Sequence, residues 1–225
     1  MIIIDEEVAK NRIAKRIAKE FQSEDQTLFI NTGIGIPTMV PAFVNTDSVV
    51  VQAENGILGV GPLAVGDEAD NQLINAGRQL ITETVGCCYF DSSTSFGMIR
   101  GGHIDATIIG AFEVDQHGNV ANWIIPNGKQ LGVGGAMDLV AGANRVIIAM
   151  QHTSRNGESK VKKDCTLPVT GYGEVDLLVT EFAVFVFEGG KMILKEIAPD
   201  ITMEELLSVT EGEFMVDPEL KLMEA

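Results

Sequence analysis

The sequence is short of positive charge and of cysteine, and it lacks any long apolar run. Lys and Arg total 16 against 32 Asp and Glu, which gives a formal net charge of −16. Because phosphate backbones bind to a basic field, we expect no nucleic-acid partner. No apolar run approaches the roughly 18 residues that cross a bilayer, and the first residues lack the basic-then-apolar order of a signal peptide. We therefore expect a cytoplasmic protein that does not bind membranes.

The cysteines exclude two kinds of stabilising site. Cys87 and Cys88 are adjacent and poorly placed to bridge each other, and Cys165 lies far along the chain. There is no CxxC pair and no other metal-ligand spacing. This usage is typical of a reducing compartment and argues against a zinc site or any other metal site.

Apolar residues make up 45% of the 225 residues, which is enough for a sizeable core. Short β-branched or apolar runs of strand length alternate with helical patterns, and the segment 176–197 alternates in polarity around Gly189 and Gly190, as antiparallel strands do. The parallel-type runs are 27–30, 48–52, 106–111 and 145–150. We predict a single domain over residues 1–225, an open and largely parallel α/β sheet with helices on both faces and an antiparallel C-terminal meander.

Helix boundaries are indicated by capping residues. Residues 5–21 form an amphipathic pattern with Asp5 as the expected N-cap, and Val8 is expected on its apolar face. Ser92 or Ser93 is the expected cap of a helix that ends at Gly101. Other caps and helix starts are a T-x-x-E capping box at Thr202 and Glu205 and a glycine-rich loop that opens a short helix within 132–143.

Glycine-rich segments follow two apolar strands and precede one helix. They read NTGIGIP (31–37), AENGILGVGP (53–62) and GVGGAMD (132–138). Glycine lets backbone N–H groups approach a ligand, and open α/β sheets place ligands at the carboxyl ends of their strands. None of the segments is a P-loop or a G-x-G-x-x-G between strand and helix, so each one alone is equally explained as a tight turn.

Glu54 stands at the end of the strand pattern 48–52, between Ala53 and the pair Asn55-Gly56. A carboxylate at such a place is explained by solvation, by capping of a nearby turn or by catalysis. The residue pattern alone leaves these alternatives open.

A set of segments resembles one protein family in content and in order. They are NTGIGIPTMV, QAENGILGVGP, DNQLINAG, SFGMIRGGHID, GNVANWIIP, GVGGAMDLV and CTLPVTG, which together cover nearly the whole chain. They resemble the β subunits of family I CoA-transferases, the group with succinyl-CoA:3-ketoacid and acetate/butyrate–acetoacetate CoA-transferases. Two positions depart from the usual pattern, since Ala53 stands where a Ser is usual and Arg78 where a Lys is frequent. The resemblance implies a fold shared with sugar-phosphate isomerases.

The resemblance implies a role for Glu54 as a covalent nucleophile that carries CoA as a glutamyl thioester. It also implies that a backbone N–H of Gly135, or else of Gly134, stabilises the oxyanion intermediates. The remaining residues that it places near substrate or CoA are Asn31, Gly33, Gly35, Asn55, Gly56 and Arg78. Asn31 is equally explained by an Asx-turn, and Arg78 by a surface position. Coenzyme A enters as a substrate, with no permanently bound cofactor.

The resemblance further implies a partner, because relatives build the site between an α and a β portion. We expect an α subunit and an α2β2 assembly, with acetate or butyrate exchanging with acetoacetyl-CoA. Succinyl-CoA is the competing donor. Two other classes stay open: an isomerase or small-molecule binding module with Glu54 as a proton-transfer base, and an acyl-CoA hydrolase that admits water at Glu54.

Overall fold

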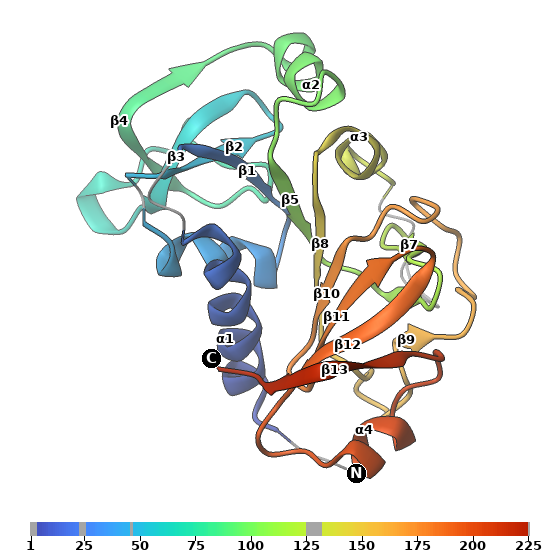
Figure 1. The fold of residues 1–225 in the computed structure, drawn as a ribbon. Helices are drawn as coiled ribbons and strands as arrows, with labels where there is room; N and C mark the ends of the chain where they lie inside the picture. Colours follow the sequence, from blue (N-terminus) through green and yellow to red (C-terminus); the bar gives the residue numbers. More distant parts are fainter. Residues whose placement is uncertain (1–3, 23–25, 46, 125–131, 225) are drawn as a thin grey trace.

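The computed structural model describes residues 4–22, 26–45, 47–124 and 132–224, and its central feature is a long mixed sheet (Figure 1). Within these residues the sheet has ten strands in the order β13-β12-β11-β10-β8-β5-β1-β2-β3-β4. Their bounds are β1 Leu28–Thr32, β2 Val49–Ala53, β3 Ile57–Leu63, β4 Ile81–Tyr89, β5 Ala106–Ile109, β8 Val146–Ala149, β10 Leu177–Val179, β11 Ala183–Glu188, β12 Lys191–Ile197 and β13 Met215–Leu222. The end of the segment GNVANWIIP, from residue 125, lies outside the described residues.

The centre of the sheet is parallel, as the continuous apolar runs predict. Strands β2, β1, β5, β8 and β10 run parallel to one another, while β3 and β4 at one end and β11 and β12 at the other are antiparallel additions. The last strand, β13, returns through α4 (Met203–Ser208) and pairs parallel to β12. The prediction of a largely parallel α/β sheet with an antiparallel C-terminal part is confirmed, and β13 extends it.

Both faces of the sheet are covered. Neighbouring strand residues alternate between faces, so Ile147 packs with the N-terminal helix and Ile148 packs in a different core cluster. The first face carries α1 (Glu6–Ala18) and the 3-10 helix η2 (Ile36–Phe43). The second face carries α4, the short helix α3 (Ala136–Gly142) and a smaller sheet. That sheet consists of β6 (Glu113–Asp115), β7 (Val120–Ala121) and β9 (Val161–Lys162).

Helix α1 begins where its sequence predicts. A carboxylate oxygen of Asp5 accepts the backbone N–H groups of Glu7 and Val8 at 3.0 and 3.1 Å, and Ile13 and Ile17 are fully buried. The expectation for Val8 is wrong, because its side chain is exposed. Nine residues separate Val8 from Ile17, which is two and a half helical turns and puts the two on opposite sides.

Helix α2 (Ser92–Arg100) is capped by a different residue from the predicted ones. Oδ1 of Asp91 accepts the backbone N–H of Thr94 at 2.8 Å, and the Ser93 hydroxyl donates to the same oxygen at 2.7 Å. Neither Ser92 nor Ser93 is the N-cap. A carboxylate is the stronger acceptor of the two residue types, and here it satisfies the helix and the serine together.

From Ile57 onward, the segment AENGILGVGP is strand β3 and not a loop. Gly59 and Gly61 lie inside this strand, opposite β4, where Thr84, Cys87 and Thr82 approach too closely to leave room for a Cβ. The glycines therefore allow close contact between antiparallel strands.

Two short 3-10 segments, η1 (Lys19–Phe21) and η3 (Gly66–Glu68), complete the elements. In the described part of the chain, no helix is long and apolar enough to cross a membrane.

Candidate active site

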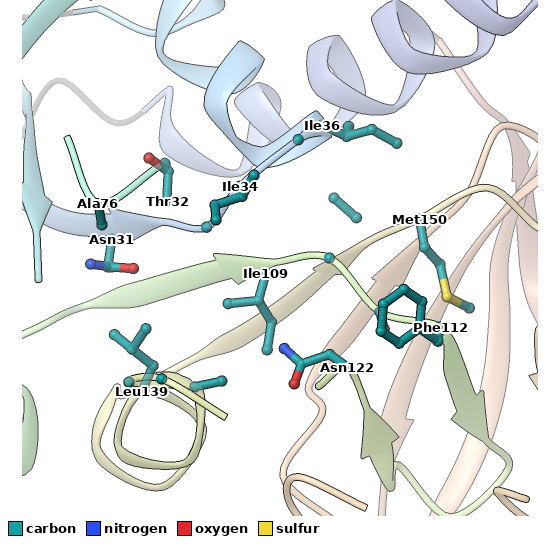
Figure 2. A pocket seen from close by; sticks show the side chains of 18 of the residues that line it. Asn31, Thr32, Ile34, Ile36, Ala76, Ile109, Phe112, Asn122, Leu139 and Met150 are labelled. Carbon is teal, nitrogen blue, oxygen red and sulfur yellow. The ribbon is translucent and has the colours of Figure 1, made fainter. Parts of the chain in front are cut away.

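A cavity of about 550 Å³ opens at the carboxyl ends of the central parallel strands. Its walls come from the residues that follow β1, β5 and β8, from Glu54 after β2, and from the glycine-rich turn before α3. Figure 2 shows the cavity with Asn31 and Leu139 on one side, Phe112 and Met150 on the other, and Ile109 and Asn122 between them. This is the edge of the sheet at which open α/β folds bind ligands.

Glu54 reaches this cavity from a tight turn. The backbone N–H of Gly56 donates to the carbonyl of Ala53 at 3.0 Å, and Gly56 has φ of 114°, a conformation that favours glycine. The Asn55 amide donates to the carbonyl of Ile74 at 2.8 Å, which ties the turn to the segment beside it. Asn55 and Gly56 therefore aim Glu54 and do not themselves line the cavity.

The surroundings of Glu54 disfavour its charged form. Burial raises the pKa of Glu54 above its ordinary value, and the nearby charge of Asp138 raises that pKa further, while the backbone N–H of Gly135 opposes the shift. Asp138 is itself paired with Arg100, with Nε and Oδ1 2.6 Å apart. A carboxylate that lines a cavity and has a perturbed pKa is a candidate functional group.

Gly135 is in direct contact with Glu54. A Cβ placed at Gly135 would overlap the Glu54 carboxylate and crowd the ring of Phe96, although the backbone φ of −85° suits any residue. Gly134, in contrast, has φ of 55° and open space where a Cβ would be. Both glycines line the cavity immediately before α3 begins. Backbone N–H groups in such a turn are available to a developing negative charge.

Asn31 belongs to a buried polar row beneath the cavity. Its amide nitrogen donates to Oε1 of Gln52 at 2.5 Å and to the Gln52 carbonyl at 3.2 Å, and the Gln52 amide donates to the Ser95 hydroxyl at 2.8 Å. All three side chains are buried, with exposed fractions of 2% or less. The side chain of Asn31 is thus held by the neighbouring strand, whereas an Asx-turn would hold it through its own loop.

The structure brings most of the predicted site residues together. Glu54, Asn31, Gly33, Gly35, Gly134 and Gly135 all line the cavity. Arg78 does not: it is exposed and lies in a turn closed by its own N–H and the Asn75 carbonyl, 2.9 Å apart. Its φ of 62° is the left-handed conformation that side chains rarely adopt.

Four other residues at the site were not predicted from the sequence. Lys10 and Lys160 line the cavity although 150 positions separate them, and Asp138 approaches Glu54 from another element. Gln52 lies two residues before Glu54, the spacing that puts two side chains on the same face of a strand, although β2 itself ends at Ala53. The two-residue spacing from Glu54 could have pointed to Gln52. Lys10, Lys160 and Asp138 approach the site only through tertiary folding, so no local pattern could have indicated them. Among the described residues, no group of three or more His, Cys, Asp or Glu is arranged to hold a metal ion.

Comparison with known proteins gives consistent matches. The family model "Coenzyme A transferase" matches residues 10–208. A Bacillus subtilis chain, named as one subunit of a probable succinyl-CoA:3-ketoacid coenzyme A transferase, is 47% identical, over 92% of this chain and 95% of its own length. The beta chain of the acetate CoA-transferase from Escherichia coli K12 is 45% identical, over 94% of this chain and 96% of its own.

Solved structures resemble the fold at low identity. The acyl-CoA transferase apoenzyme from E. coli O157:H7 superposes with a TM-score of 0.76 at 23% identity, over 99% of this chain and 45% of that one. The same enzyme has been solved as a thioester complex with CoA, which superposes with a TM-score of 0.72 at 22% identity and over 99% of this chain. This chain therefore spans less than half the length of that enzyme.

Proposed function

Since this chain belongs to the coenzyme A transferase family, we propose that it is the catalytic β subunit of an enzyme that moves CoA between a short-chain acyl-CoA and a carboxylic acid. Glu54 is the nucleophile in this proposal, and the backbone N–H of Gly135 stabilises the oxyanions. The observation that carries the proposal is the contact, inside the cavity, between the Glu54 carboxylate and the Gly135 backbone.

The first step forms a mixed anhydride. A carboxylate oxygen of Glu54 attacks the thioester carbon of the acyl-CoA, the C–S bond breaks, and CoA leaves as a thiolate. The tetrahedral intermediate carries its negative charge beside the N–H of Gly135. No proton is transferred, so the step needs no acid or base. The burial that raises the pKa of Glu54 also removes water from its oxygens, which favours attack by this carboxylate.

The second step transfers CoA to the enzyme. The thiolate attacks the Glu54 side of the anhydride, the bond from that carbonyl carbon to the bridging oxygen breaks, and the first acid leaves as a carboxylate. Glu54 is left as a glutamyl-CoA thioester. An incoming carboxylate then reverses both steps and departs as the new acyl-CoA, which makes the cycle ping-pong. The apolar cavity residues Ile109, Leu139 and Met150 help to keep out water, which would hydrolyse the anhydride.

The substrates and the assembly follow the relatives' names and the sequence pattern. We take acetate or butyrate as acceptors of CoA from acetoacetyl-CoA, with succinyl-CoA as the competing donor. The two bacterial relatives are each named as one kind of subunit within a larger enzyme, which supports an α subunit that completes the site in an α2β2 enzyme of the cytoplasm. Arg78 is exposed, which suits contact with a CoA phosphate beyond the cavity.

The proposal is tested by initial rates of the chain reconstituted with an α subunit. Acetoacetyl-CoA and acetate are varied together, and formation of acetyl-CoA is measured. We expect parallel double-reciprocal lines and no release of free CoA in the absence of an acid. Intersecting lines contradict the covalent cycle. CoA release without an acid identifies a hydrolase, and no reaction in any combination leaves the isomerase or binding-module alternative.

A further inference from the structure

The buried polar row beneath the cavity consists of Asn31 on β1, Gln52 on β2 and Ser95 on α2, and no step of the proposed reaction uses Gln52 or Ser95. The strand register places Asn31 beside Gln52 on one side and beside Thr107 of β5 on the other. All four side chains are at most 2% exposed. Buried polar groups are costly unless they are paired, so the partner of each group in the row indicates its role.

Both N–H groups of the Asn31 side chain are directed to Gln52. The amide nitrogen donates to the backbone carbonyl of Gln52 at 3.2 Å and to Gln52 Oε1 at 2.5 Å. A backbone carbonyl can only accept, so it fixes which end of the Asn31 amide faces β2. Since an amide nitrogen carries two N–H groups, Asn31 has none left to donate to an oxyanion. This supports the choice of the Gly135 backbone for that task.

The orientation of the Gln52 side chain is set from the helix above the sheet. Its amide nitrogen donates to the Ser95 hydroxyl at 2.8 Å, and Ser95 lies on α2. With the nitrogen bound to Ser95, the oxygen of the same amide is turned towards Asn31. A chain of hydrogen bonds therefore runs from α2 through Gln52 to the side chain of Asn31.

The oxygen of the Asn31 amide faces the cavity. Figure 2 shows Asn31 Oδ1 turned towards Ile109, with the amide nitrogen on the far side. Within the described residues, the hydrogen bonds of the Asn31 side chain are the two to Gln52, and Asn31 lines the cavity. The hydroxyl of Thr107, its other neighbour, has no hydrogen-bond partner in that part of the chain. Asn31 thus presents a hydrogen-bond acceptor to a ligand.

Few groups of the proposed substrates could donate to such an acceptor. Carboxylates and thioester carbonyls only accept hydrogen bonds. In an acyl-CoA, the donor nearest to the reacting sulfur is an amide N–H, which a two-carbon link separates from that sulfur. The sulfur reacts at Glu54, which follows Gln52 by two residues and lines the same cavity as Asn31. This amide N–H therefore matches the acceptor on Asn31.

We propose that Gln52 is a positioning residue: held by Ser95, it turns the Asn31 amide so that Asn31 Oδ1 accepts the N–H of the coenzyme A amide nearest to the sulfur. The inference rests on the proposed transferase function and adds to it a pair of residues that positions the thioester arm without touching it.

The test measures kcat/KM for acetoacetyl-CoA and for acetate separately, with the reconstituted enzyme. Gln52→Met removes the polar end of the side chain at similar length. Gln52→Glu is the conservative variant, because one carboxyl oxygen still accepts from Asn31 and the other can accept from the Ser95 hydroxyl. Thr107→Val is the matched control, since it removes a hydroxyl without a partner from the other neighbour of Asn31. Thermal unfolding reports whether each variant is folded.

We expect Gln52→Met to lower kcat/KM for acetoacetyl-CoA about 10-fold and to change kcat/KM for acetate by less than about twofold. The acetate step is spared because the coenzyme is already bound covalently when the acid arrives. Gln52→Glu should restore most of the loss, and Thr107→Val should behave as the wild type. A general packing defect would lower both values together.

A substrate analogue tests the contact without depending on a variant that folds. In this analogue of acetoacetyl-CoA, a methylene replaces the N–H of the amide nearest to the sulfur. The wild type should use it with about 10-fold lower kcat/KM than acetoacetyl-CoA. Gln52→Met should use both thioesters equally within about twofold, because the contact that the analogue lacks is already lost.

Four results overturn the inference. A wild type that uses the analogue as well as acetoacetyl-CoA removes the contact with the coenzyme amide and leaves the transferase function intact. Fully additive losses in Gln52→Met with the analogue show that Gln52 does not act through that amide. Equal losses for acetoacetyl-CoA and acetate, or a Thr107→Val variant as impaired as Gln52→Met, assign the row to packing. Absence of transfer by the wild type removes the proposed function and the inference with it.

Discussion

The backbone of Gly135 lies directly against the carboxylate of Glu54, so closely that a Cβ at this position would overlap a carboxylate oxygen. Because the backbone dihedrals of Gly135 suit any residue, the contact with Glu54, and not the backbone conformation, requires glycine here. The contact joins two turns from distant parts of the sequence, one after β2 and one before α3.

Gly135→Ala is expected to lower kcat by about 100-fold or more, because the methyl group must displace the carboxylate that it meets. Gly134→Ala is the comparison, because its Cβ would enter open space. Its φ of 55° strains any residue with a Cβ, so this variant should lose about 1 to 2 kcal/mol of folding stability. We expect a much smaller loss of kcat for Gly134→Ala. Equal losses for the two variants in a steady-state assay would contradict the importance of the contact.

The pH dependence of kcat/KM should respond to Asp138 and Arg100 in opposite directions. The charge of Asp138 raises the pKa of Glu54, so Asp138→Asn lowers that pKa and moves the acid limb of the profile to lower pH. Arg100→Met removes the cation that pairs with Asp138 and should move the limb to higher pH. Shifts in the same direction for both variants, or none, would show that Asp138 does not act on the nucleophile.

Replacement of Glu54 should stabilise the isolated chain as well as stop the reaction. The pKa of Glu54 is raised by folding, so its contribution to stability is greatest below the unfolded-state pKa and falls as pH rises through the folded-state pKa. Glu54→Gln removes this loss and should raise Tm at pH 7 by on the order of 1–3 °C, with little change near pH 4.

The control for this stability gain is Glu68→Gln, at an exposed position of η3, for which we expect no change in Tm. A Glu54→Gln variant that unfolds at a lower temperature than the wild type at pH 7 would mean that the carboxylate is held by stabilising contacts.

The role of the Arg78 backbone conformation and the role of its charge can be tested separately. Arg78→Gly accepts the φ of 62° without strain and should leave the free energy of unfolding unchanged or raise it by up to about 1 kcal/mol. If the guanidinium contacts a CoA phosphate, the same variant should raise KM for acyl-CoA about 10-fold, and Arg78→Lys should raise it less than about threefold. A wild-type KM for Arg78→Gly would assign Arg78 to the turn alone.

The sequence predicts the parallel centre of the sheet and the first helix well, because each depends on a local pattern. The strand predicted at residues 48–52 is observed one residue later as β2 (Val49–Ala53), and Asp5 caps α1 as expected. The strand β3 was missed because Gly59 and Gly61 resemble loop residues until the close approach of β4 is known. Asp91, one residue before the serines, is the N-cap of α2 because its carboxylate accepts the backbone N–H of Thr94.

For the candidate site, too, part could be predicted from the sequence and part could not. The ordered motifs indicate Glu54, Asn31, Gly33, Gly35, Gly134 and Gly135, and these residues meet at one cavity, which Asn55 and Gly56 do not line. Lys160 and Asp138 were not expected there, since charged residues in a chain of this composition normally face solvent. Lys160 lies at the cavity and Asp138 acts on Glu54 because of how β9 and α3 pack on the sheet, and no local sequence pattern indicates this packing.

The proposed cycle depends on a covalent bond at Glu54, and the most direct test is to trap it. The reconstituted enzyme is incubated with acetoacetyl-CoA without an acceptor acid, treated with borohydride, digested, and analysed by mass spectrometry. The covalent cycle predicts loss of activity and reduction of the Glu54 side chain to an alcohol, confined to the peptide that holds Glu54. An unmodified Glu54 in enzyme that has lost its activity, or a modified carboxylate elsewhere, would contradict it.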